Sequence, residues 1–239
     1  MASGGNLLLS LFDAADLDIL VPHMEWVRIA QGDLLVRANQ PIEHIYFLES
    51  GIASLLAARP GERRAGVGII GREGLCGAAA LLEAGSAAHD VVLQVENDRA
   101  HRVPVEVMLR LMEDRPAIRR LMLRYVQTLF VQLGSNAAAN LSDRLDIRLA
   151  RWLLMCHDRV DDDLIAMTHE ATAIMIGSQR TAVTGALHLL EGDRLIQGGR
   201  GVIRIVDRGG LEARAQNTYG VAEAEYRRLL TRFGKSADA

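Results

Sequence analysis

Residues 167–196, MTHEATAIMIGSQRTAVTGALHLLEGDRLI, decide the fold of the C-terminal half of this chain. Apolar residues recur at helical spacing on both sides of Gly177, which predicts two short helices. Thr168 is a good N-cap for the first helix, and Gly177 can adopt the positive φ that ends a helix tightly. The second helix opens with small or polar side chains. This layout is typical of a helix-turn-helix, whose second helix enters the major groove of DNA.

The residues after the second helix favour this interpretation over an ordinary helical hairpin that serves only packing. Glycines around Arg200 predict a tight turn between residues 195–197 and residues 202–206, and the second of these runs is β-branched. Two strands joined by an arginine-bearing turn form a wing beside the second helix. The sequence therefore predicts a winged helix-turn-helix.

Candidate DNA contacts lie in the cap of the first helix, along the start of the second helix and on the wing. We expect these residues to contact phosphates or base edges: Thr168, Ser178, Gln179, Arg180, Thr181, Thr184 and Arg200. The plainer alternative is that each of them belongs to a solvated helix face.

A local excess of positive charge coincides with the predicted DNA-binding surface. The whole sequence carries 27 Lys and Arg against 30 Asp and Glu, a formal net charge of -3. Residues 142–208 are near neutral, with nine Arg against ten acidic residues, which departs from the usual basic footprint. Within residues 176–208, five Arg outnumber three acidic residues. This local excess suits phosphate contacts.

The composition argues against several other classes of protein. At 239 residues, of which 49% are hydrophobic, the chain is long enough for one large or two modest domains. Its apolar runs are shorter than the ~20 residues of a membrane span, and its start lacks the charged region of a secretory signal. We expect a cytoplasmic protein without membrane contact. Signatures of zinc proteases, nucleophile elbows and phosphate loops are missing, so we expect neither an enzyme nor a metal site.

The N-terminal half predicts a small barrel or β-roll. Between residues 25 and 104, short apolar runs such as residues 52–56 alternate with glycine and polar turns. The fold class expected for the whole chain is therefore α+β. The expected parts are the roll in residues 1–116, a connecting helix in 117–140, the winged domain in 141–208 and a helical tail in 209–239.

The connecting helix carries the candidate contact between two subunits. Its narrow apolar seam steps by three or four residues, as in helices that pair with a second helix: Ile118, Met122, Tyr125, Leu129 and Leu133. Leu121, Val126 and Phe130 are expected to pack on the chain's own domain. The alternative is a helix that makes only intrachain contacts.

The order of these parts resembles the Crp/Fnr family of bacterial transcription regulators. The residues that carry the resemblance are QGDLL at 31–35, IYFLESG at 45–51 and GREGLCG at 71–77, together with residues 167–196. The resemblance implies a homodimer that reads a two-fold-symmetric DNA operator under the control of an N-terminal effector domain. It also implies contact with RNA polymerase if the protein is an activator.

The resemblance gives Arg180 a specific role. In this family an arginine near the start of the second helix commonly contacts guanine, and Arg180 matches that position. Members that bind the operator of the cyclic-nucleotide regulators often carry Glu one residue later and Arg five residues later. This chain has Thr181 and Gly185 at those positions, so we expect a different operator.

The segment that would bind a cyclic nucleotide lacks the residues for it. Family members that bind one have Glu after the glycine that matches Gly77 and Arg about ten residues later, whereas this chain has Ala78 and then Ala88 and His89. A buried phosphate without a guanidinium partner would be an unpaired charge. We therefore expect no cyclic-nucleotide binding, and any cofactor or effector is unidentified. The residues expected to line an effector pocket are Gly71, Glu73, Gly77, Ala78 and His89.

The tail, residues 209–239, extends beyond the resemblance. Tyr226, Leu229, Leu230 and Phe233 form the apolar side of a predicted helix, which packs on the winged domain or on a second subunit. Residues 235–239 are expected to be disordered. The function expected for the whole chain is sequence-specific DNA binding in transcription regulation. The alternative is a sensory or interaction module that has lost DNA binding.

Overall fold

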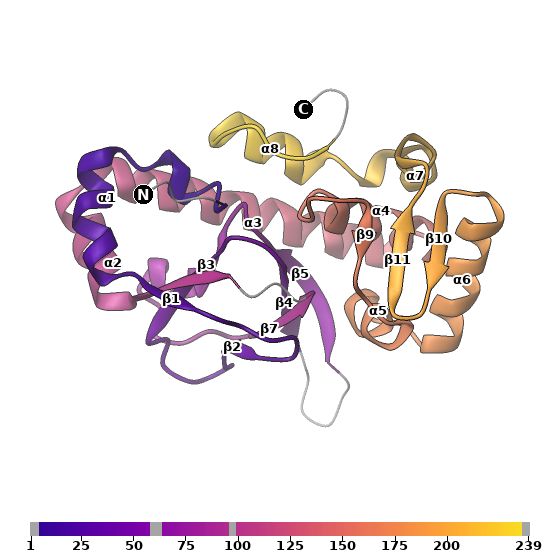
Figure 1. Ribbon diagram of the computed structural model, residues 1–239, viewed down its shortest axis with the longest axis horizontal. Coiled ribbons are helices and arrows are strands. Elements are labelled where there is room, and N and C mark those ends of the chain that lie inside the picture. The colour runs from indigo at the N-terminus through magenta and orange to yellow at the C-terminus, as the bar shows by residue number, and fades with distance from the viewer. Residues whose placement is uncertain (1–4, 58–63, 96–98, 236–239) are drawn as a thin grey trace.

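The computed structural model describes residues 5–57, 64–95 and 99–235, and it confirms the α+β fold class (Figure 1). A β-roll and a winged helix-turn-helix domain lie side by side, and one long helix runs behind both of them. Within the described ranges, no helix is both long and apolar enough to span a membrane.

The β-roll consists of two four-stranded sheets, in the orders β1-β8-β3-β6 and β2-β7-β4-β5. All pairs of neighbouring strands in it are antiparallel, which short turn-rich connections allow. The strands are β1 (Glu25–Val27), β2 (Leu34–Val36), β3 (His44–Leu48), β4 (Ile52–Ala57), β5 (Ala65–Ile70), β6 (Leu75–Cys76), β7 (Asp90–Val95) and β8 (Ala100–Pro104). Short helical segments precede or interrupt them: η1 (Leu9–Leu11), α1 (Ala14–Leu20), η2 (Val21–His23) and η3 (Ala78–Leu82).

Two helices follow the roll, α2 (Val105–Asp114) and α3 (Pro116–Ser142). Pro116 occupies the first turn of α3, where a residue without a backbone N–H fits well. The first half of α3 packs against the roll, and its second half reaches the winged domain. The helix α3 therefore contacts both domains.

The apolar seam predicted for a second subunit faces the chain's own roll, so that prediction is wrong. Four of its side chains lie in the core of the roll and are at most 9% exposed: Ile118, Met122, Tyr125 and Leu129. The fifth, Leu133, is half-buried against β5. The Tyr125 hydroxyl donates to the Leu75 carbonyl at 3.0 Å and accepts from the Leu75 N–H at 3.1 Å, which fixes this face inward. Phe130, predicted to pack on its own domain, is instead 61% exposed.

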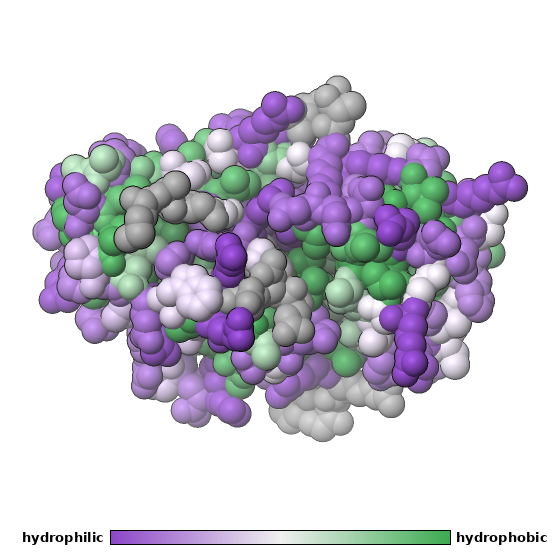
Figure 2. All heavy atoms as spheres, viewed as in Figure 1, coloured by the Kyte–Doolittle hydropathy of each residue, from purple (hydrophilic) through white to green (hydrophobic). Residues whose placement is uncertain are grey.

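The winged domain contains three helices and a small sheet in the order β10-β11-β9. Its elements are α4 (Leu145–His157), β9 (Leu164–Ile165), α5 (His169–Ile176), α6 (Arg180–Gly192), β10 (Ile196–Gly199) and β11 (Val202–Ile205). On the face seen in Figure 2, hydrophobic residues show over β9 and β11, beside the roll. An apolar core shared by the two domains lies at this junction, where Ile52 and Ile69 of the roll pack in one cluster with Leu153 and Met175.

The tail folds back over the molecule as α7 (Arg208–Ala215), η4 (Gln216–Thr218) and α8 (Val221–Leu229). Whereas α7 packs on α4, α8 lies along α3 (Figure 1). The packing of α7 on α4 agrees with one of the two surfaces expected for the tail, the winged domain. Tyr226 and Phe233 are instead buried in the core of the roll, a surface that the sequence did not predict for them. Lys235, predicted to be disordered, donates its backbone N–H to the Asp158 carboxylate at 2.9 Å, and residues 236–239 lie outside the described ranges.

Candidate nucleic-acid interface

The helix-turn-helix forms from local signals that hold α5 and α6 in place. The Thr168 hydroxyl accepts the N–H of Ala171 at 3.2 Å and so caps α5. Gly177 ends α5 with φ of 63°, and the N–H of Ser178 then returns to the carbonyl of Ala173 at 2.9 Å. Both local predictions are confirmed. The Thr168 hydroxyl is thus engaged in the cap.

The α6 helix has one buried side and one exposed side. Val183, Leu187 and Leu190 are at most 4% exposed and fix the helix to its domain. The opposite side presents small and polar residues to solvent: Gln179, Arg180, Thr181, Ala182, Gly185 and His188. Because Gly185 and Ala182 carry little side chain, the backbone of α6 can approach another surface closely. A helix with such a face can enter a groove of DNA with its N-terminal residues.

Thr184 occupies a different environment from its predicted neighbours on α6. It is half-buried, and its hydroxyl lies 2.9 Å from Nδ1 of His169, at the start of α5. This contact ties the two helices together beside the exposed face. The DNA contacts predicted from the sequence include neither His169, which positions Thr184, nor the exposed His188. The signal for His188 was available, because it lies one helical turn beyond Gly185 on the same face.

The wing is formed by two strands, β10 and β11, which follow α6 in the chain. β10 and β11 pair in register, with Gly199 opposite Val202, and Arg200 is exposed in the turn between them. The N–H of Gly198 donates to the Glu191 carboxylate at 2.9 Å, which links the wing to the end of α6. The structure therefore groups Ser178, Gln179, Arg180 and Thr181 at the start of α6, and carries Arg200 on the wing.

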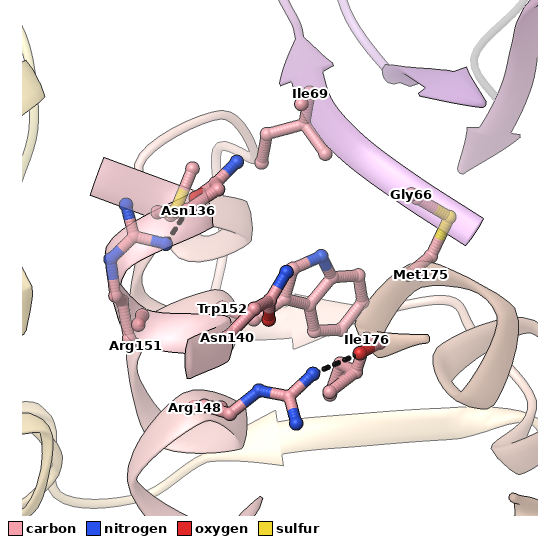
Figure 3. A pocket seen from close by; sticks show the side chains of 12 residues that line it. Gly66, Ile69, Asn136, Asn140, Arg148, Arg151, Trp152, Met175 and Ile176 are labelled. Atoms are coloured by element: carbon pink, nitrogen blue, oxygen red, sulfur yellow. Dashed lines mark hydrogen bonds between the residues drawn. The ribbon is translucent and has the colours of Figure 1, made fainter. Parts of the chain in front are cut away.

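At the junction drawn in Figure 3, α5 packs against β5 of the roll, and α4 contacts both α5 and α3. Met175 of α5 lies directly over Gly66 of β5, where any added Cβ would overlap it. From α4, the guanidinium of Arg148 donates to the carbonyl of Ile176, at the end of α5. The guanidinium of Arg151 donates to the side chain of Asn136 on α3. The start of α6 thus has a fixed position relative to the roll.

Two residues predicted to line an effector pocket belong to the domain junction, which corrects that prediction. The Glu73 carboxylate binds Nε of Arg159 at 2.9 Å, and both side chains are at most 4% exposed. Gly71 lies under the aliphatic part of Arg159, so a Cβ there would come within 2.8 Å of Cγ. Because both side chains are out of contact with water, each charge depends on the other, and the N–H of Gly71 also donates to the Glu73 carboxylate at 3.0 Å.

The remaining pocket candidates lie in backbone-paired loops of the roll. Gly77 has φ of 96° and leads into η3, which begins at Ala78. His89 is half-buried in the turn before β7. In the same turn, the Ala87 carbonyl accepts the N–H of Asn39 at 2.8 Å. The side chains at positions 78 and 88 are methyl groups, so neither can neutralise a phosphate.

The two cysteines and the possible metal ligands are further candidates for a functional site among the described residues. Cys76 and Cys156 are completely buried and unpaired, and burial raises the pKa of both thiols. Such thiols are small core residues rather than reactive groups. In the part of the chain that the structure describes, His, Cys, Asp and Glu form no group of three that could hold a metal ion.

Comparison with known proteins assigns both domains. Residues 26–115 match the family described as the cyclic nucleotide-binding domain, and residues 147–214 match the Crp-like helix-turn-helix domain. The HTH-type transcriptional regulator Cmr of Mycobacterium tuberculosis is 28% identical over 212 residues, which cover 84% of this chain and 80% of that protein.

Solved structures share the fold along most of their length. A transcriptional regulator of the Crp/Fnr family from Eubacterium rectale superposes with a TM-score of 0.67 at 18% identity, covering 87% of this chain and 97% of the other. The c-di-GMP-responsive global regulator CLP of Xanthomonas campestris superposes with a TM-score of 0.66 at 16% identity, covering 81% and 99%.

Proposed function

Because the chain belongs to the Crp/Fnr family of transcription regulators, we propose that it binds a two-fold-symmetric DNA operator as a homodimer. The observation that carries this proposal is the exposed face of α6, which is polar at its N-terminal end and rigidly supported from behind. Arg180 stands at the start of this face, where its planar donor group can bind O6 and N7 of guanine. In this proposal, Arg200, which is exposed in the turn of the wing, contacts a phosphate.

The dimer contact that we propose is the outer side of α3. Its exposed residues follow alternating steps of four and three, the spacing of a seam between paired helices: Leu123, Gln127, Phe130, Gly134, Ala137 and Leu141. Leu123, Phe130 and Leu141 are 41%, 61% and 89% exposed in the single chain. Large apolar side chains at this exposure and this spacing are typical of a surface that a second copy covers.

We further propose that cyclic AMP is not the effector. The charged pair that would hold its ribose and phosphate is replaced by Ala78 and Ala88, and Glu73 is already engaged by Arg159. An effector, if this protein uses one, then acts at a site of different chemistry.

The test of operator binding is selection of duplexes from a random pool by the full-length protein. We expect an inverted repeat whose half-sites lie about one helical turn apart, roughly 34–36 Å. Enrichment of isolated half-sites would contradict a dimeric reader. No enrichment, even after addition of cell extract to supply an effector, would support the alternative of an interaction module that has lost DNA binding.

The test of the dimer contact is the Phe130→Glu variant, studied by light scattering on a sizing column. A charge at the centre of the proposed seam should convert the dimer to a monomer, because it would be buried without a partner. Ile19→Glu is the matched control, since Ile19 is 42% exposed on α1 and lies outside the seam. A Phe130→Glu variant that stays dimeric would move the contact elsewhere.

A further inference from the structure

Residues 208–235 form a segment that contacts both the winged domain and the roll, which we call the C-terminal clamp. The Crp-like domain match ends at residue 214, within its first helix. The clamp contains α7, η4, α8 and residues 230–235, and in Figure 1 it lies across the side of the molecule along which α3 and α4 run. Both of its ends bind the Asp158 carboxylate of the winged domain, through Arg208 and the N–H of Lys235, whereas Tyr226 and Phe233, which lie between these ends, contact the roll.

The first anchor of the clamp is on the winged domain. The Arg208 guanidinium binds the Asp158 carboxylate at 2.9 Å and the Tyr219 hydroxyl at 2.7 Å. Tyr219 in turn donates to the other oxygen of Asp158 at 2.5 Å. The Asp158 side chain is completely buried, so its charge depends on these partners. Charge-assisted hydrogen bonds of this kind are stronger than neutral ones.

The second anchor is on the roll. The Tyr226 hydroxyl donates to the backbone carbonyl of Glu73 at 2.6 Å, and Tyr226 is only 2% exposed. Phe233 is 4% exposed and packs in the core cluster of the roll, with its ring centroid 5.0 Å from that of Tyr226. Two aromatic side chains from the end of the chain therefore complete the core of a domain that begins at the other end.

The two anchors meet at one buried ion pair between the domains. Arg159, directly after α4, binds Glu73 of the roll, and its guanidinium lies 5.1 Å from the ring centroid of Phe233. Next to it, Lys235 donates its ammonium to the carbonyl of Asp162 at 2.8 Å. Tyr226 and Phe233 of the clamp thus cover the Arg159–Glu73 pair, and the clamp contacts both residues of this pair.

We propose that the C-terminal clamp fixes the winged domain to the roll and thereby sets the orientation in which α6 is presented to DNA. The apolar junction around Met175 also joins the domains, so opening of the clamp loosens their arrangement without separating them fully. In the clamped arrangement Gln179, Arg180 and Thr181 are exposed. On this proposal, the clamp holds the conformation in which these three residues are exposed.

The direct test is a distance measurement between spin labels on Glu106→Cys in α2 and Leu189→Cys in α6. Both positions are exposed, whereas the natural Cys76 and Cys156 are completely buried and unavailable to the label. We expect one narrow distance distribution for the otherwise unchanged protein and a clearly broader one for the added Phe233→Ala substitution. Arg232→Ala, one residue away on the exposed surface, is the control and should leave the distribution narrow.

A milder variant keeps the test valid if Phe233→Ala does not fold. Tyr226→Phe removes only the hydrogen bond to Glu73 and should broaden the distribution to a smaller extent. Unchanged distributions in folded samples of both variants would overturn the proposal.

A second measurement, DNA affinity, rests on the proposed function. Coupling energies of the usual size predict that Phe233→Ala weakens operator binding at least about fivefold. Unchanged or tighter binding would contradict the proposed link between the clamp and DNA reading. If the distances broaden but neither protein binds DNA, the mechanical role of the clamp stands and the proposed function fails.

Discussion

The start of α6 and the segment around Gly77 both occupy places where this family binds a ligand, but only the first has kept the chemistry for it. At the start of α6, Gln179, Arg180 and Thr181 are exposed above a fully packed helix face. Around Gly77, the polar residues are replaced by alanines, and the nearby acid Glu73 is paired with an arginine of the winged domain. On the function proposed above, the segment around Gly77 contributes through its contacts with the winged domain, such as the Arg159–Glu73 pair.

The largest effect is expected from breaking the Arg159–Glu73 pair, a buried ion pair between the roll and the winged domain. Arg159→Ala should lower the free energy of unfolding by about 3–5 kcal/mol, because it leaves the Glu73 carboxylate buried without a partner. Denaturation in urea measures this. Arg72→Ala is the control: its partner Asp161 is 81% exposed, so its loss should cost about 0–1 kcal/mol.

The double substitution Glu73→Gln/Arg159→Met sharpens the interpretation of this first result. It removes both charges of the pair and should recover the part of the loss in Arg159→Ala that comes from the unpaired Glu73 carboxylate, although the buried Glu223 still loses the nearby charge of Arg159. A double variant as unstable as Arg159→Ala would show that packing of the arginine, and not its charge, holds the domains together.

The next largest effect is expected on DNA binding by the start of α6. Arg180→Ala should weaken operator binding by about 1–3 kcal/mol and relax specificity at one base pair in each half-site. Binding to the selected operator and to single-base variants of it measures both. Arg194→Ala, an exposed arginine after the end of α6, serves as the charge-matched control. Equal losses on all sequences would instead make Arg180 a phosphate contact.

These two regions also differ in how well the sequence predicts them. The cap at Thr168 and the turn at Gly177 depend on interactions within a few residues, so local rules were sufficient to place α5 and α6. The Arg159–Glu73 pair joins positions 86 residues apart, and charged residues are rarely so buried, so nothing local indicated it. The same holds for the docking of Phe233 into the roll.

The helical phase of α3 was mispredicted for a different reason. Apolar residues at helical spacing occur on two sides of this helix, and periodicity alone cannot say which side meets the chain's own roll. Tyr125 decides the matter through its two hydrogen bonds to Leu75, which the sequence does not reveal. The exposed side then becomes the candidate for a second subunit.

A smaller effect is expected from pH at the junction between α4 and the winged sheet. Burial lowers the pKa of His157, whose ring contacts Asp163 and Arg208 and lies near Lys235. The neutral ring is therefore favoured in the folded state. Its contribution to stability should be complete above the ordinary value of 6.5 and lost as the pH falls from there through the lowered pKa.

The measurement is the free energy of unfolding as a function of pH, compared with His157→Gln. The difference between the two proteins should decrease on acidification through this range. Subtraction is needed because burial raises the pKa of Glu223, which has the opposite sign and favours the folded state at low pH. A difference that is independent of pH would show that His157 does not titrate between the two states.

The smallest effect, and the one that most directly tests the comparison, is the response to cyclic AMP. Titration calorimetry should detect no binding, and the melting temperature should not change, because the methyl groups of Ala78 and Ala88 cannot replace a carboxylate and a guanidinium. Saturable binding of cyclic AMP would contradict the expectation that the roll does not bind it, and would mean that other residues of the roll bind the phosphate. His89→Ala would then be the first variant to measure, because His89 directly follows Ala88 and is the ionisable residue nearest to it in the sequence.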